Sequence, residues 1–308
     1  MTDPPAEEVS RDEKATAASA TLPRLSVVVP CFNDAETLGA QLEALVRQEY
    51  DGWFEVIVAD NGSTDDSSLV ADRYRSKLPR LRVVDASGAR GAGHARNVGA
   101  EAAVGDAFLF CDADDEVGAG WLKTMGHALQ EHDFVASSYE TERLNEPSVQ
   151  RTRHLPPPGQ LLPYPPYLPH AGGSGLGVRR ELFTAVGGFD ESFMRLQDTD
   201  FCVRVQLAGT PLVFPEGAVV HCRYETRWLE IFRQARSYAE GNARLLARHG
   251  SGVPNRGGWW KWPLRHWLAI AKAAATAWDA GARARLAWTL GWQVGRIRGT
   301  LRYHVPAV

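Results

Sequence analysis

The sequence contains no uninterrupted apolar run of about 18 residues, which a membrane-spanning helix needs, so we expect no transmembrane segment. It has only four cysteines, and no two of them form a C-x-x-C pair, which excludes motifs built on such pairs. Reduced, buried thiols in a cytoplasmic protein are favoured instead. The cysteines are Cys31, Cys111, Cys202 and Cys222.

The chain also lacks an excess of charge of one sign. Its net charge is −3, which argues against a nucleic-acid partner. Residues 1–22 are polar, acidic and rich in Ala and Pro, without the pattern of a signal peptide, and we expect them to be a disordered lead-in. The hydrophobic content of 44% and the length of 308 residues fit one large α/β domain with an appendage.

Short apolar runs alternate with stretches of helical spacing in the first part of the chain, which predicts an α/β fold with a mostly parallel, doubly wound sheet. We expect four strands there, at Leu25–Pro30, Phe54–Ala59, Leu81–Asp85 and Asp106–Cys111. The helices between them are expected from Asn33 or Asp34 to about Arg47, from the Asp60 loop to about Lys77, and from about Gly93.

The second half is less regular. Residues 141–170 are rich in proline and predict a long loop, either a functional lid or a disordered segment. Strands are expected at His132–Ser138, Leu212–Phe214 and Ala218–His221, and helices at Arg179–Val186, Asp198–Leu207 and from Trp228 onward.

Three carboxylates directly follow the apolar run that ends at Cys111, namely Asp112, Asp114 and Asp115. At the carboxyl end of a strand they would lie where open α/β sheets bind ligands. Like charges repel, and hard oxygen ligands suit Mg²⁺ or Mn²⁺ bound together with substrate phosphates. The alternative is an acidic turn that caps the next helix.

Five motifs occur in a fixed order, each unspecific by itself. They are Val29–Asn33, Asp60–Asp65, Gly93–Gly99, Cys111–Asp115, and Gly187–Glu191 followed by Gln197–Asp200. Together, over about Leu25–Tyr224, the chain resembles the family 2 glycosyltransferases. The resemblance implies a GT-A fold (a Rossmann-like, doubly wound mixed sheet), a divalent metal (Mn²⁺ or Mg²⁺) and inversion at the anomeric carbon. It also implies a nucleotide-diphosphate sugar donor, with a UDP- or dTDP-sugar favoured.

The resemblance places nucleotide-binding residues in four of these motifs. Asp60 would hold the nucleobase, although an Asx-turn is the alternative. Phe32 could stack on the base or be a core aromatic, and Pro30 would shape the turn. Arg96 would contact the base or a phosphate, or else pair with an acid, and Asp112 would contact the ribose.

The resemblance also assigns the metal to Asp114. Asp115 is expected to belong to the donor site as a neighbour of this metal ligand. His221 ends an apolar run and would supply an imidazole ligand, the alternative being a satisfied, partly buried histidine. Gly173 and Ser174 belong to a glycine-rich segment that the family places near the donor sugar and the acceptor. The same glycines would also suit a plain flexible connection.

Asp198 is the expected catalytic base, because the acceptor hydroxyl must lose a proton as it attacks. The family pattern here is Glu-Asp, and Gln197 replaces the Glu, which puts details of acceptor orientation in doubt. The alternative for Asp198 is a helix N-cap. Asp200 is expected to be structural.

The tail from Ser251 carries nine Lys/Arg against one acid and seven of the ten tryptophans. Basic, Trp-rich helices are typical of membrane interfaces, so peripheral contact with the inner face of a membrane and a lipid-linked acceptor are one hypothesis. A helical cap on the core or a homodimer surface is the other. We expect three regions: a disordered segment (1–22), a GT-A domain (23–225) and a basic helical region (226–308).

The sequence thus predicts a metal-dependent, inverting glycosyltransferase that moves a sugar to an acceptor hydroxyl. Two other classes are kept as alternatives. One is a non-catalytic protein that binds sugar nucleotides, which need not retain both Asp114 and Asp198. The other is a nucleotidyltransferase of similar fold, which needs a basic, Gly-rich phosphate loop after the first strand, and residues 32–36 do not supply one.

Overall fold

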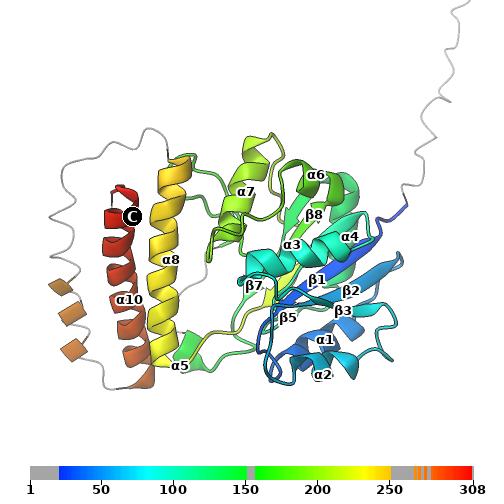
Figure 1. Cartoon of the computed structure of the whole chain (residues 1–308), viewed down its shortest axis with the longest axis horizontal. Coiled ribbons are helices and arrows are strands. Elements are labelled where there is room, and N and C mark those ends of the chain that lie inside the picture. The colour runs from blue at the N-terminus through cyan, green and yellow to red at the C-terminus, as the bar shows by residue number, and fades with distance from the viewer. Residues whose placement is uncertain are drawn as a thin grey trace, which may run out of the picture.

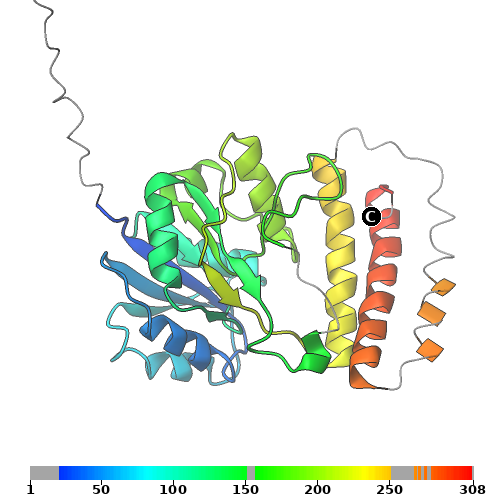
Figure 2. The same ribbon diagram turned by 180° about the vertical axis from the view of Figure 1, so that it is seen from behind.

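A computed structural model describes residues 21–150, 157–250, 267–268, 270–271, 274–275 and 279–306. The expectation of disorder for residues 1–22 therefore lies almost entirely outside the described residues. The fold has a sheet covered by helices and, beside it, two long helices that run side by side (Figure 1, Figure 2). These are α8 (Trp228–His249) and α10 (Ala280–Tyr303).

The main sheet has six strands in the order β3-β2-β1-β4-β8-β6. The first four are parallel to one another, whereas β8 is antiparallel to both β4 and β6, so the expected doubly wound, mixed sheet is confirmed. In chain order the strands are β1 Leu25–Cys31, β2 Phe54–Asp60, β3 Leu81–Asp85, β4 Ala107–Phe110, β6 Phe134–Ala136 and β8 Leu176–Arg179.

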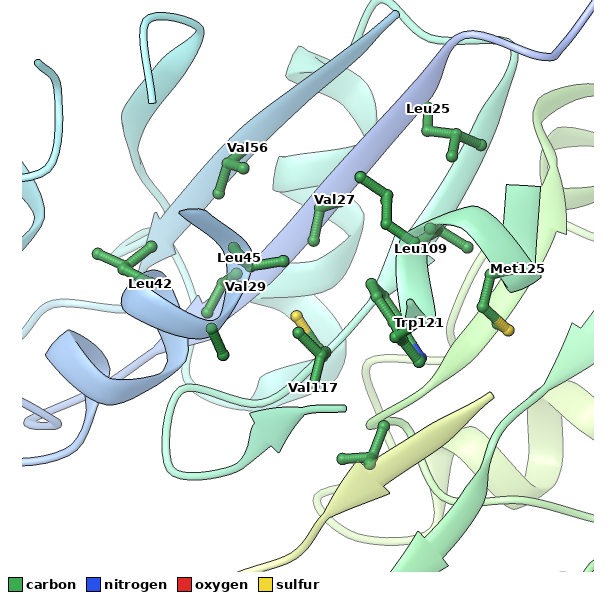
Figure 3. Packing of buried hydrophobic residues seen from close by; sticks show 14 of the residues in the cluster. Leu25, Val27, Val29, Leu42, Leu45, Val56, Leu109, Val117, Trp121 and Met125 are labelled. Carbon is green, nitrogen blue, oxygen red and sulfur yellow. The ribbon is translucent and has the colours of Figure 1, made fainter. Parts of the chain in front are cut away.

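Alternation along the central strands sends side chains to both faces of the sheet, and both faces are buried. Leu25, Val27 and Val29 pack under α1 (Leu38–Val46) and α4 (Trp121–Glu131), with fully buried Trp121 at the centre (Figure 3). The opposite face, which includes Val28, packs against a second set of helices. These are α3 (Ala92–Ala102), α6 (Arg180–Ala185) and α7 (Gln197–Leu207).

Two predicted helix boundaries are wrong. The first helix begins at Leu38 after Thr37, and not at Asn33 or Asp34. Asn33 has a left-handed backbone (φ 57°), and the Asp34 carboxylate accepts a 2.9 Å hydrogen bond from the N–H of Phe32, so both residues shape the turn after β1. The helix α2 (Ser67–Asp72) ends before Lys77.

A small second sheet, in the order β5-β9-β7, was not predicted as such. Its strands are β5 Glu116–Val117, β7 Ser138–Glu140 and β9 Val219–His221. Strands of two or three residues give no readable alternation. The strand predicted at 212–214 is reduced to an isolated bridge between Val213 and Val135. Among the described residues of the predicted long loop is a short helix, α5 (Pro147–Gln150).

The helices α8 and α10 are parallel and closely packed. Gly291, Gly295 and Gly299 follow one another at four-residue intervals and face α8. A Cβ at Gly295 would lie 2.1 Å from the carbonyl oxygen of Arg236, so only glycine allows this approach. The C-terminal helical extension was expected, but this glycine-mediated packing was not.

Candidate active site

The acidic cluster follows β4, where the sheet ends. Asp112, Asp114 and Asp115 each offer a carboxylate oxygen, and these oxygens lie within 4.8 Å of one another. Asp114 faces the open cavity described below, whereas only 6% of Asp115 is exposed. Asp115 accepts a 2.9 Å hydrogen bond from the N–H of Arg223, which fixes its orientation within the cluster.

Burial and neighbouring carboxylates affect the titration of Asp114 and Asp115. Desolvation, followed by the carboxylates of Asp112 and Asp34, raises the pKa of Asp114 above its ordinary value. Desolvation and the neighbouring Asp114 carboxylate raise the pKa of Asp115 as well. The cluster therefore disfavours its own negative charge and would gain from a nearby cation.

Arg96 lies behind this cluster and not on an open surface. Only 2% of it is exposed, and its Nη2 donates a 2.5 Å hydrogen bond to Oδ1 of Asp112. Burial acts to lower the pKa of Arg96, but the carboxylates of Asp112 and Asp198 outweigh burial and raise it. The acid-paired alternative describes this arginine, so in this structure it orients Asp112 and does not present itself to a nucleotide.

Asp198 occupies the second position of α7, and the N-cap residue is Leu196. Its Oδ2 accepts a 2.7 Å hydrogen bond from the N–H of Gly173, and its Oδ1 accepts one of 2.7 Å from the N–H of Thr199. Asp198 also lines the cavity. An N-cap role alone therefore does not describe this carboxylate, which links the glycine-rich segment to the start of α7.

The glycine-rich segment is anchored on both sides. The hydroxyl of Tyr139 lies 3.0 Å from the carbonyl oxygen of Gly172 and 2.8 Å from that of Ser174, within donating distance of both. The Ser174 hydroxyl accepts a 3.1 Å hydrogen bond from the N–H of Asp112. These contacts argue against a plain flexible connection. Sequence reasoning missed Tyr139, because a lone aromatic in a three-residue strand carries no signal of its own.

One cavity of about 440 Å³ brings these groups together. Its wall includes the acidic cluster, Asp198 and the segment from Gly172 to Ser174, and its far side is formed by α8 and α10. Carboxylates on the sheet side thus face aromatic residues on the helical side.

Of the five predicted nucleotide-binding residues, only Asp112 lines this cavity; Pro30, Phe32, Asp60 and Arg96 do not. Phe32 is 51% exposed after β1, so its ring is open to contact and is not a core aromatic. Asp60 ends β2, and its Oδ1 accepts a 2.8 Å hydrogen bond from the N–H of Ser63, three residues further on, so the carboxylate holds its own loop together. Pro30 is buried within β1 and can act only through backbone position.

His221 does not join the acidic cluster found among the described residues. Its Nδ1 instead pairs with Oε2 of Glu140 on the neighbouring strand β7. Pairing of β9 with β7 directs the ring toward that carboxylate. The contact with Glu140 occupies only Nδ1 and leaves Nε2 as the nitrogen that would bind a metal, so the metal-ligand role of His221 stays a prediction.

No helix within the described part of the chain has both the length and the apolar character needed to cross a membrane. Four of the seven tail tryptophans, Trp259, Trp260, Trp262 and Trp278, lie outside the described residues. Of the described ones, Trp288 and Trp292 line the cavity and Trp267 is 40% exposed.

Comparison with known families gives the class of this protein. The model of glycosyl transferase family 2 matches residues 26–187, and the model of glycosyl transferase family group 2 matches residues 163–296. The first match covers more than half of the chain. The protein therefore belongs to glycosyl transferase family 2.

Two curated relatives show how far the likeness extends. The amylovoran biosynthesis glycosyltransferase AmsB of Erwinia amylovora is 30% identical over 217 residues, which cover 66% of this chain and 70% of that protein. The glycosyltransferase GlyG of Streptococcus pneumoniae is 34% identical over 109 residues, 35% of this chain and 36% of the relative. The chain thus matches only about a third of the length of some relatives.

Solved structures share the fold. The mannosyltransferase PcManGT from Pyrobaculum calidifontis, in complex with GDP-Man and Mn²⁺, is 19% identical, with a TM-score of 0.65 over 91% of this chain and 88% of that one. S. aureus TarS 1–349 is 21% identical, with a TM-score of 0.56 over 92% of each chain. At these identities the likeness establishes the GT-A fold.

Proposed function

We propose that this protein is a metal-dependent, inverting glycosyltransferase that moves a sugar from a nucleotide-diphosphate donor to an acceptor hydroxyl. The observation that carries the proposal is the shared cavity, in which the acidic cluster and Asp198 line one space. A donor held by the cluster would present its sugar to Asp198. Residues 23–225 would form the catalytic unit, and α8 and α10 would close it on the acceptor side.

The donor side is supported by the relatives as well as by the geometry. PcManGT was solved with GDP-Man and TarS 1–349 with UDP-GlcNAc, so this fold accommodates sugar nucleotides. In this chain the exposed ring of Phe32 and the carboxylate of Asp60 would take the base. Asp112, held by Arg96, would take the ribose. A UDP- or dTDP-sugar stays our prediction for the donor.

The chemistry of the acidic cluster fits a divalent cation. Three carboxylates with oxygens within 4.8 Å form a hard donor set, and two of them have raised pKa values. Asp114, open to the cavity, would hold Mn²⁺ or Mg²⁺. The buried Asp115 would add negative charge close to the ion. A bound divalent ion stabilises negative charge on a leaving diphosphate.

Asp198 would accept the proton of the acceptor hydroxyl as the oxygen attacks the anomeric carbon. Hydrogen bonds from Gly173 and Thr199 hold its carboxylate in place. Attack from the side opposite the diphosphate inverts the anomeric carbon.

Membrane contact by the basic tail stays a separate prediction. Flotation of the full chain with anionic and with neutral liposomes tests it, and equal recovery in the unbound fraction with both would contradict it.

A donor panel tests the main proposal. The chain is incubated with UDP-, dTDP- and GDP-sugars and Mn²⁺, with methyl glycosides added as acceptors and enough time for slow transfer of the sugar to water, and the products are separated by chromatography. A glycosyltransferase releases the nucleoside diphosphate only when the donor is used, whereas a nucleotidyltransferase consumes or forms pyrophosphate. A non-catalytic binding protein releases neither, and that result would contradict the proposal.

A further inference from the structure

The helical wall of the cavity is built from two rows of side chains. Gln234, Tyr238 and Asn242 lie at four-residue intervals on α8, and Trp288 and Trp292 are four residues apart on α10; all five line the cavity. Residues four apart share one face of a helix. Each helix therefore presents one continuous row to the cavity that Asp198 also lines.

The packing of the two helices fixes these rows. On α8 the residues next to the cavity row are Ala235, Ala239 and Ala243, all buried. They meet the glycines of α10: a Cβ added at Gly295 would lie 2.8 Å from that of Ala239, and one at Gly299 would lie 2.5 Å from that of Ala243. Such close contact leaves little freedom for sliding or rotation, so the aromatic side chains are held in position before a ligand arrives.

The aromatic rings form one connected surface. The Trp288 and Trp292 rings are stacked at 24° with centroids 6.0 Å apart, and the Tyr238 ring lies 6.2 Å from that of Trp288. Indole rings present a flat apolar face, and a pyranose ring presents an apolar face of C–H groups with hydroxyls around its edge. The two shapes are complementary.

Polar groups surround these rings. The amides of Gln234 and Asn242 lie in the same row as Tyr238, and Asp198 and His170 line the same cavity. A hydrocarbon chain would need an apolar wall throughout, because covering the Asp198 carboxyl and the Nδ1 of His170, which is unpaired among the described residues, without new hydrogen bonds is costly. Aromatic faces bordered by amides and carboxylates match a saccharide better than a lipid tail.

We propose that Trp288 and Trp292, together with Tyr238, form an acceptor subsite that binds a sugar ring of a saccharide acceptor opposite Asp198. This inference rests on the proposed glycosyltransferase function and adds the chemical class of the acceptor. The two tryptophans set specificity by contact with the acceptor and take no part in donor binding.

Saturation-transfer NMR on the full chain tests the subsite. The probes are methyl β-glycosides of glucose, galactose, mannose and N-acetylglucosamine, each added in the presence of UDP and Mn²⁺. We expect ring-proton signals from at least one glycoside, about five-fold weaker binding in Trp292→Leu, and partial recovery in Trp292→Phe, which keeps an aromatic face. Trp288→Leu should act in the same direction. Trp228→Leu is the matched control, because Trp228 is 67% exposed on α8 and does not line this cavity.

Several outcomes would overturn the subsite. One is the absence of ring-proton signals from every glycoside, and another is equal signals in wild type and Trp292→Leu. The third is Trp292-dependent binding of citronellyl phosphate, a probe for a lipid acceptor, with no glycoside binding. Calorimetry with the donor panel separates this failure from failure of the function itself. If the tryptophan variants bind a nucleotide sugar as the wild type does, only the acceptor assignment falls; if the wild type binds none, the proposed function falls.

Discussion

The N–H of Gly173 donates a 2.7 Å hydrogen bond to Oδ2 of Asp198, a residue 25 positions further along the chain. This contact joins the glycine-rich segment after the long loop to the first turn of α7. It fixes the carboxylate by a backbone donor, which is far less mobile than a side chain. A carboxylate held this way lines the cavity without rearrangement.

Replacement of the base is the first prediction. Asp198→Asn keeps one oxygen for the Gly173 hydrogen bond and loses the one from Thr199, so the fold and nucleotide binding should be retained with a small loss of stability. Without a proton acceptor, the transfer rate should fall by about 10²- to 10⁴-fold. Single-turnover kinetics alongside calorimetry of nucleotide binding measure both effects. Near-normal turnover would show that Asp198 is not the base.

The close approach of Gly173 to Arg96 gives the second prediction. A Cβ at Gly173 would lie 2.3 Å from Nη2 of Arg96, which must then move away from Asp112. We expect Gly173→Ala to destabilise the protein by about 1–3 kcal/mol and to weaken nucleotide binding. Urea unfolding and calorimetry test this. Gly39→Ala is the control, because its Cβ would meet other atoms at 3.7 Å, an ordinary contact.

The third prediction concerns the packing of α10 on α8. Gly295→Val would place a branched side chain against the Arg236 carbonyl, 2.1 Å from the new Cβ, and should lower the free energy of unfolding by about 1–3 kcal/mol or more. Leu301→Ala on the same helix, at a residue 71% exposed, should change it by no more than about 0.5 kcal/mol. Similar midpoints in thermal unfolding for both variants would contradict the packing described here.

The fourth prediction concerns Asp190, which connects the loop before α7 to Arg248 on α8. Partial burial acts to raise the pKa of Asp190, but hydrogen bonds from Ser192 and Arg248 outweigh it and lower the pKa to about 2. The folded state therefore favours the carboxylate, and the resulting stability is fully present above the ordinary pKa of about 3.8 and is lost as the pH falls toward 2.

Asp190→Asn removes this contribution. Urea unfolding should show the variant less stable than the wild type by about 1–2 kcal/mol at pH 6, with the difference shrinking at pH 3. A difference that does not change between the two pH values would show that the Asp190 carboxylate is not stabilised in the folded state.

The sequence predicted most of the central sheet because long β-branched runs alternate there with helical spacing. It also predicted that the carboxylates after Cys111 and the carboxylate of Asp198 would belong to one site, because the family motifs occur in order. It could not show that Arg96 turns inward to Asp112, since pairing with an acid or opening to solvent is decided by the packing of α3 against the sheet.

The second sheet and the helical wall of the cavity could not be predicted from the sequence, for different reasons. The contact of His221 with Glu140 follows from the pairing of β9 with β7, and strands of three residues leave no pattern that predicts this pairing. The tail was interpreted from its tryptophans and charges alone. The glycines at four-residue intervals in α10 are the sequence feature that indicates close helix packing.

The most direct test of the central claim is calorimetric titration of the chain with UDP-, dTDP- and GDP-sugars, with and without Mn²⁺, in the wild type and in Asp114→Asn. The account predicts that at least one donor binds, that Mn²⁺ strengthens binding by about tenfold or more, and that Asp114→Asn removes this gain while leaving the thermal midpoint near that of the wild type. Absence of binding by every donor in both conditions, or equal binding with and without Mn²⁺, would contradict it.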